Sequence, residues 1–174
     1  MIYTIIATGS SAQDFIPRGH VIGCNDAARW GKELNSLVVC NRPQQFSKER
    51  YEIIKNTKDD NFYSHKSAWK TEFPNWKKIN LVPWYGTYNR SQIYSSNTSP
   101  IIAITLAAKL GAKEIIMWGV DMMNHHLFNT GNPQTKKEVD IYLQLHEQLK
   151  ENDIRLWLGN TGTAFDNVIP VWKD

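Results

Sequence analysis

A run of short polar side chains precedes a proline in the middle of the chain. Residues 95–99 read Ser-Ser-Asn-Thr-Ser, Pro100 follows, and an acid, Asp121, comes after the next apolar stretch. A hydroxyl residue before a proline is a helix-start signal, because the hydroxyl can accept a backbone N–H and the proline has none to satisfy. The free N–H groups of such a helix favour a phosphate or a carboxylate, so this block predicts one wall of a nucleotide site.

The elements around this block have the pattern of half a βαβ unit. The helix is expected to begin at Ser99 or Pro100 and to end before Gly111, which sits where a left-handed residue follows a helix. Residues Glu114–Trp118 are short and apolar enough for a buried strand, which places Asp121 at its carboxyl end. Ligands of open α/β sheets collect at such ends. On spacing alone, Ser99 and Asp121 are explained equally well as caps of a helix and a turn.

A second candidate loop follows the first apolar stretch of the chain, residues 2–7. It reads Thr8-Gly9-Ser10-Ser11 and opens a short helix. The glycine lets the backbone approach a ligand closely, and the serines can cap the helix or bond a phosphate. The loop has neither the GxGxxG spacing of a dinucleotide fold nor the GK[ST] of a P-loop, so on its own it is a weak phosphate signal.

Two further predicted strands, His20–Cys24 and 37–40, both end in asparagine, at Asn25 and Asn41. An amide can donate and accept hydrogen bonds, which suits a sugar hydroxyl or a phosphate oxygen. Asparagine also favours turns for local reasons, but the repetition beside the Gly-Ser loop favours a binding role.

The remaining pattern alternates strands with helices. We expect a helix at 44–56, strands at Asn61–Ser64 and 79–82, an amphipathic helix at 136–152 that packs His146, a strand at 154–158 and, at Thr163–Asp166, the capped start of a last helix. This predicts an α/β fold: a single Rossmann-like domain over residues 1–174, with a mainly parallel β-sheet flanked by helices.

Composition is that of an ordinary globular protein. The 174 residues are 41% hydrophobic and 21% charged, with a net charge of +3. No apolar run approaches the roughly 20 residues that span a bilayer, and the N-terminus lacks a signal-peptide pattern, so a cytoplasmic location is expected. Cys24 and Cys40 fall in apolar stretches and are expected as buried thiols. No ligand spacing for a metal is found, and the adjacent pair His125-His126 is weak evidence for one.

A segment at about 60–95 mixes basic and aromatic side chains, among them Trp69, Trp76 and Trp84. Such a mixture can stack bases or sugar rings and hold phosphates, which leaves nucleic acid open as a partner. The alternative is a small satellite core with solvated lysines. Exposed aromatics between residues 69 and 88 could also form an acceptor groove or an interface in a homo-oligomer.

Several segments together resemble a known family. They are IIATGSS, VIGCN, LVVCNRP, NTSP with the helix behind it, GAKEIIMWGVDMM and DIRLWL. Their order and approximate spacing resemble the bacterial sialyltransferases of glycosyltransferase family forty-two over nearly the whole chain. The hydroxymethylpterin pyrophosphokinase-like proteins are similar in their Gly-Pro-Ser loop.

The resemblance implies roles for residues of this chain. Asn25 and Asn41 match the asparagines that help to hold the phosphate and sugar of a cytidine-monophosphate (CMP) donor, and Thr98 and Ser99 match the hydroxyl pair by the phosphate. The glycine and the acid beside the nucleoside are matched by Gly119 and Asp121. The family's first loop, Gly-Asn-Gly-Pro-Ser, is Ala-Thr-Gly-Ser-Ser here, so Gly9 and Ser11 match while Thr8 and Ser10 depart.

The segment after Asp121 departs further from the family. There, a lid supplies tyrosines for the leaving phosphate and, just before the late helix, a histidine base. Here the lid, at about 122–136, is much shorter, and no histidine stands directly before Glu138. His125 or His126 could serve as the base, because histidine titrates near neutral pH. Lys136 or Lys137 could neutralise a leaving phosphate.

The leading hypothesis is therefore a glycosyltransferase-like protein that binds a nucleotide-activated sugar, a CMP-sugar, and transfers the sugar to a hydroxyl acceptor. No cofactor and no metal are expected by the resemblance. One alternative keeps the fold without the chemistry, as a catalytically inactive module that binds or sequesters a nucleotide. The other is a pyrophosphokinase-like enzyme, which needs ATP and a divalent ion.

Overall fold

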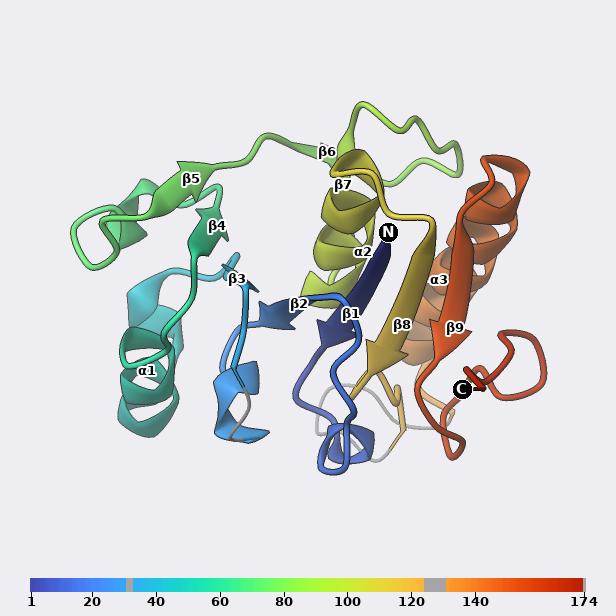
Figure 1. Cartoon of the computed structure of the whole chain (residues 1–174), viewed down its shortest axis with the longest axis horizontal. Helices are drawn as coiled ribbons and strands as arrows, with labels where there is room; N and C mark the ends of the chain where they lie inside the picture. Colours follow the sequence, from blue (N-terminus) through green and yellow to red (C-terminus); the bar gives the residue numbers. More distant parts are fainter. Residues whose placement is uncertain (31–32, 124–130, 174) are drawn as a thin grey trace.

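The central sheet is built outward from the first strand in two opposite directions. In the computed structural model, which describes residues 1–30, 33–123 and 131–173, seven strands pair in the order β5-β4-β3-β2-β1-β8-β9, and every pair is parallel (Figure 1). The strands are β1 (Ile2–Ile6), β2 (His20–Cys24), β3 (Ser36–Val38), β4 (Asn61–Ser64), β5 (Trp76–Lys78), β8 (Glu114–Trp118) and β9 (Arg155–Leu158). The Rossmann-like parallel sheet predicted from the sequence is confirmed.

The order of strands reverses between β1 and β8. The chain leaves β1 toward β2 and returns later to pair β8 on the other side of β1, with Ile2 opposite Glu114 and Ile6 opposite Trp118. Ligands of open α/β sheets bind at the carboxyl ends of the strands at such a switch point. The register therefore brings residues 7–11 and 119–121 to the same place.

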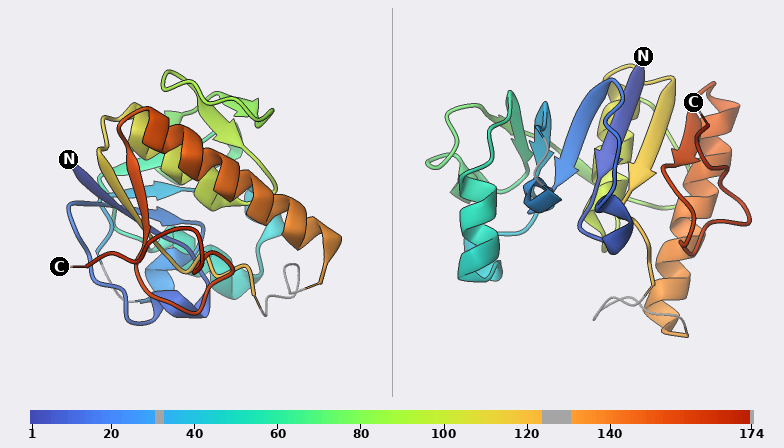
Figure 2. Two further views of the ribbon diagram at one scale, coloured as in Figure 1. Left: turned by 90° about the vertical axis from the view of Figure 1, so that its right-hand side faces the viewer. Right: turned by 60° about the horizontal axis from the view of Figure 1, so that its bottom comes forward.

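Helices and loops cover both faces of this sheet, as a parallel sheet requires. The two long helices, α2 (Ser99–Lys109) and α3 (Pro133–Glu151), pack on one face, where Ile5 of β1 points (Figure 2). Ile6 points to the other face, which α1 (Lys48–Lys55) and short 3-10 helices cover. The 3-10 helices are Ser10–Ala12, Ala27–Trp30, Pro43–Gln45 and Ser67–Trp69.

The end of α2 follows the sequence signal. Gly111 has a φ of +99°, its N–H bonds the Ala108 carbonyl at 3.1 Å, and the Ala112 N–H bonds the Ala107 carbonyl at 3.0 Å. This pair of bonds is the Schellman arrangement that stops a helix and turns the chain, here into β8.

Two strands of three residues, β5 and β7 (Ile93–Ser95), escaped the sequence analysis. A second sheet pairs β6 (Leu81–Pro83) with β7 (Ile93–Ser95) in parallel, where a strand was expected at 79–82. Neither β5 nor β7 was predicted, because three residues are too few to display a period.

Two helix predictions were wrong in extent and one in kind. Residues 44–56 are split by extended Phe46, because Ser47 caps α1 by accepting the Arg50 N–H at 3.4 Å. α3 begins at Pro133 rather than residue 136, since Asn132 accepts the Gln134 N–H at 2.8 Å.

No helix forms from Thr163 to Asp166. The Asp166 carboxylate reaches back to accept from the Gly162 N–H at 2.6 Å and the Thr163 N–H at 2.9 Å, which closes a turn. Pro170 then disfavours helical backbone at the residue before it.

The aromatic segment divides between core and surface. Phe62, Trp69 and Phe73 are buried in one cluster under α1, so these rings cannot stack bases. Lys70, Lys77 and Lys78 are exposed. This is the satellite-core alternative for residues 60–75.

The two cysteines differ in burial. Cys24 is buried as expected, while Cys40 is half-buried, and both are free. Burial raises the pKa of both thiols, that of Cys40 to about 12.

Among the described residues no helix is long and apolar enough to cross a membrane.

Trp69 joins this satellite core to the predicted site. Its ring packs against Phe62 and Phe73, and its indole N–H donates to the Asn41 carbonyl at 2.8 Å. We expect Trp69→Phe to lower the free energy of unfolding by about 1–3 kcal/mol, because the Asn41 carbonyl loses its donor and the core loses volume. Urea denaturation measures this loss. Half-buried Trp172, in an edge contact with Trp157, is the control; its replacement by Phe should cost less than about 1 kcal/mol, and equal losses would contradict the prediction.

Asp59 gives a pH dependence of stability. Burial raises the pKa of its carboxyl, and the hydrogen bond from Asn75 lowers it by less, so the pKa is about 6. Because the folded pKa lies above the unfolded one, the folded state binds this proton more tightly, and the stabilisation is lost as pH rises through about 6. Asp59→Asn should therefore raise the melting temperature at pH 8 and leave it unchanged at pH 4. A gain that is the same at both pH values would contradict the assignment.

Candidate functional site

The floor of the site joins the loop after β1 to the turn after β8. The Ala7 N–H bonds the Trp118 carbonyl at 2.8 Å, the Gly9 N–H bonds the Gly119 carbonyl at 2.9 Å, and the Gly119 N–H donates to Ser11 Oγ at 2.9 Å. A Cβ on Gly9 would lie 2.5 Å from the Gly119 carbonyl oxygen. Glycine is therefore required at this position by the closeness of the two loops.

Asp121 ties the same two loops together through its side chain. Its carboxylate accepts the Ser11 N–H at 3.0 Å, the Ser10 hydroxyl at 3.3 Å and the Ser11 hydroxyl. The side chain is 8% exposed and lines the cavity described next. Much of its hydrogen-bonding capacity is spent on the protein, so Asp121 shapes the floor as well as facing a ligand.

A cavity of about 480 Å³ lies above this floor, at the carboxyl ends of β1, β2 and β8. Its walls contain every binding residue predicted from the sequence except Ser11, which lies beneath it holding Asp121. They are Gly9, Ser10, Asn25, Asn41, Thr98, Ser99, Gly119 and Asp121. Residues more than a hundred positions apart thus meet in one place.

Asn25 holds a strained backbone at the edge of this cavity. Its φ is +54°, and Met122, which also lines the cavity, has the same value. Non-glycine residues rarely adopt this conformation, and such strain clusters at ligand sites. The Asn25 amide nitrogen donates to Ser99 Oγ at 3.2 Å, while its Oδ1 is buried with no hydrogen-bond partner among the described residues. A ligand in the cavity can supply that partner.

The start of α2 is left open toward the cavity. Thr98 is its N-cap and Pro100 lies in its first turn, yet the Thr98 side chain makes no capping hydrogen bond. Its hydroxyl instead lies 2.8 Å from Tyr142 Oη. The expectation that a hydroxyl caps this helix was wrong, and the positive end of the helix dipole remains for an anion.

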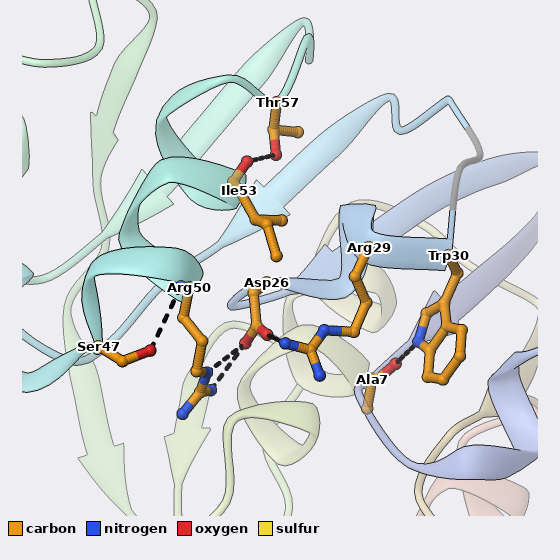
Figure 3. Close-up of polar contacts among 8 residues, drawn as sticks. All are labelled: Ala7, Asp26, Arg29, Trp30, Ser47, Arg50, Ile53 and Thr57. Carbon is orange, nitrogen blue, oxygen red and sulfur yellow. Dashed lines mark hydrogen bonds and ion pairs between the residues drawn. The ribbon is translucent and has the colours of Figure 1, made fainter.

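Arg50 is a cavity residue that the sequence analysis missed. It comes from α1, and its guanidinium donates to Asp26 Oδ1 at 2.9 and 2.7 Å (Figure 3). Asp26 is fully buried and also pairs with Arg29 at 2.7 Å. Two cations on one buried acid leave a net positive charge beside Asn25. The signal available was Asp26 itself, a charged residue directly after a buried strand, which needs a cation.

Tyr142 is a second cavity residue that the sequence analysis missed, because its spacing on α3 indicated packing only. It is fully buried, yet its hydroxyl pairs with Thr98 and lines the cavity. Burial raises the pKa of Tyr142 well above its ordinary value, so the phenol stays protonated and keeps a proton to donate.

The two histidines predicted as a catalytic base, His125 and His126, are not among the residues that the structure describes. Lys136 and Lys137 are exposed in the first turns of α3 rather than in a lid. His146 is buried on the same helix, as expected, and burial lowers the pKa of its ring.

Comparison with known proteins gives a fold. No protein-family model matches the chain, and no curated protein matches its sequence. The sialyltransferase CstII from Campylobacter jejuni, in complex with the substrate analogue CMP-3FNeuAc, has a TM-score of 0.61 at 14% identity, over 98% of this chain and 85% of that one. CstII with a trisaccharide acceptor and CMP gives 0.61 at 16% identity, over 97% and 85%.

The monofunctional α-2,3-sialyltransferase Cst-I from Campylobacter jejuni matches in the same way. Its TM-score is 0.60 at 18% identity, over 97% of this chain and 79% of that one. The chain therefore has the fold of the Campylobacter jejuni sialyltransferases, as the resemblance in its sequence predicts.

Proposed function

We propose that this protein binds a nucleotide-activated sugar, a CMP-sugar, in the cavity at the β1/β8 switch point and transfers the sugar to a hydroxyl acceptor. The observation that carries the proposal is the convergence of Gly9, Asn25, Thr98 and Asp121 on one cavity of about 480 Å³. Such a volume lies in the range of small-ligand sites. The fold shared with CMP-bound sialyltransferases supports the same reading.

The charges in the cavity suit a phosphodiester donor. The uncapped start of α2 and the Arg50 guanidinium are both positive, and the Asp121 carboxylate is held by hydroxyl and N–H donors. In transfer, the acceptor oxygen bonds the anomeric carbon, the bond from that carbon to the phosphate oxygen breaks, and the nucleotide leaves as an anion. Fixed positive groups that face the leaving phosphate stabilise the charge that develops there.

The proton of the acceptor hydroxyl needs a base. His125 or His126 is proposed for this role from the sequence, and Tyr142 can donate a hydrogen bond to the leaving phosphate. Among the described cavity residues there is no histidine, and the one carboxylate is already bonded to Ser10 and Ser11. This last observation favours, as a second candidate, a module that binds the nucleotide without turnover.

Nucleotide binding is tested by calorimetry with CMP, UMP and AMP. CMP should bind, and Asn25→Gly should weaken binding at least about tenfold, because the amide is lost while glycine keeps the left-handed backbone. Asp153→Gly is the matched control, since Asp153 has a φ of +57° at an exposed turn after α3. Its affinity for CMP should equal that of the wild type. Failure of the wild type to bind any of the three nucleotides would sink the proposal.

Hydrolysis of a CMP-activated sialic acid separates enzyme from binding module. The double variant His125→Ala, His126→Ala should lose about 100-fold or more of the turnover with little change in CMP affinity, because general base catalysis is worth about that much. His65→Gln, a half-buried histidine that does not line the cavity, should keep wild-type turnover. Tight CMP binding by the wild type with no turnover of any donor would decide for the module.

A further inference from the structure

A second, smaller hollow lies next to the main cavity. It has a volume of about 270 Å³ and is walled by the ends of β6 and β7 and by the start of α3. Its lining residues are Pro83, Trp84, Ser95, Ser96, Asn97, Lys137, Glu138 and Ile141. Asn97 lines both the hollow and the main cavity, so the two are neighbours at that residue.

Glu138 lines this hollow and has one carboxylate oxygen without a hydrogen-bond partner among the described residues. The residue is fully buried, and its Oε1 accepts from the Asn97 N–H at 3.2 Å, the Asn97 amide at 2.9 Å and the Gln134 amide at 3.4 Å. Its Oε2 is buried with no hydrogen-bond partner among the described residues. An unpaired buried carboxylate oxygen is costly, and only a donor can satisfy it. A hydroxyl or an amine of a ligand could donate to such an oxygen.

Trp84 supplies an aromatic ring to the lining of the same hollow. Its indole N–H donates to Gln144 Oε1 of α3 at 3.1 Å. Its ring packs edge-on against the Tyr94 ring, with 5.1 Å between the ring centroids. The loop that follows is tied to the same helix, where Gln148 accepts the Tyr88 N–H at 2.5 Å and donates to the Gly86 carbonyl. The half-buried ring is therefore held in place before any ligand arrives.

We propose that this hollow binds a pyranose sugar. The ring of a pyranose has an apolar C–H face, which fits the Trp84 ring, and hydroxyls at its edge, one of which donates to Glu138 Oε2. Pockets of this kind combine aromatic walls with a few placed polar groups. This inference rests on the proposed function, under which the sugar belongs either to the acceptor or to the CMP-sugar donor. Both offer a pyranose ring with hydroxyls, and because Asn97 lines both spaces a sugar in the hollow would lie next to the nucleotide cavity.

Ligand-observed NMR with methyl β-D-galactopyranoside, methyl β-D-glucopyranoside and lactose tests the hollow, with and without CMP. The linear polyol sorbitol is the ligand control, because it has the hydroxyls without the ring face. We expect at least one pyranose to bind and sorbitol not to bind. Binding of the free sugar identifies an acceptor subsite. Binding only as part of a CMP-sugar, seen as a tighter complex than CMP alone gives, identifies the sugar of the donor.

Two substitutions connect the binding to the two walls. Glu138→Gln replaces one carboxylate oxygen by an amide donor, and Trp84→Leu keeps an apolar side chain without the ring face; each should weaken sugar binding at least about tenfold. The matched controls are exposed Glu151→Gln on the same helix and Trp172→Leu, neither of which lines the hollow. Both should bind sugar as the wild type does.

CMP affinity, measured on the same variants, separates a ligand role from a structural one. If Glu138 serves only to brace Asn97, Glu138→Gln will weaken CMP binding and lower stability without a selective loss of sugar, which overturns the proposal. A protein that binds CMP but shows no pyranose binding in either form overturns it as well and leaves the proposed nucleotide site intact. Absence of CMP binding, by contrast, would sink the proposed function and leave the free-sugar result to decide the hollow.

Discussion

The close contact between the loop after β1 and the turn after β8 is the constraint on which the rest of the site depends. The two strands pair in register along five residues, and beyond their ends Gly9 bonds Gly119 while Asp121 accepts from Ser10 and Ser11. Because a Cβ at Gly9 or Gly119 would lie within 3 Å of backbone on the opposite loop, both positions require glycine. This fixed floor sets the distance from the β8 turn to Asn25 and to the start of α2.

The site keeps several features that a fold optimised for stability alone would lose. Asn25 and Met122 have left-handed backbones, α2 has no side-chain cap, and Asn25 Oδ1 and Glu138 Oε2 are buried without protein partners. Each is unfavourable by itself, and strain of this kind persists where the surrounding structure imposes it. All of them border the two neighbouring cavities. They leave both cavities with polar groups that a bound ligand could satisfy.

The sequence analysis anticipated the parallel sheet and most of the cavity wall, because those features follow from local chemistry. Gly111 at φ +99° and the apolar run of β8 are signals that a single segment carries. Arg50 and Tyr142 were missed as cavity residues because their places depend on how the helices pack, whereas the segment that contains Trp84 was already noted as a possible sugar-stacking surface. Asp26 offered a partial clue, since a buried acid at the end of a strand requires a cation that the sequence does not name. The helix expected at residue 163 failed because a carboxylate at Asp166 closes a tighter local turn.

The hydroxyls of Thr98 and Ser99 fit the pattern of a helix cap in the sequence but make other contacts in the structure. A serine or threonine before Pro100 indicates a capped helix, and a cap of this type stabilises by about 1 kcal/mol. Here Thr98 pairs with Tyr142 and Ser99 receives the Asn25 amide, so both hydroxyls connect α2 to other walls of the cavity. The helix thereby forgoes its own cap, and its positive dipole end stays beside the cavity. The polar run therefore does more than start a helix, because its hydroxyls also join α2 to Asn25 and Tyr142.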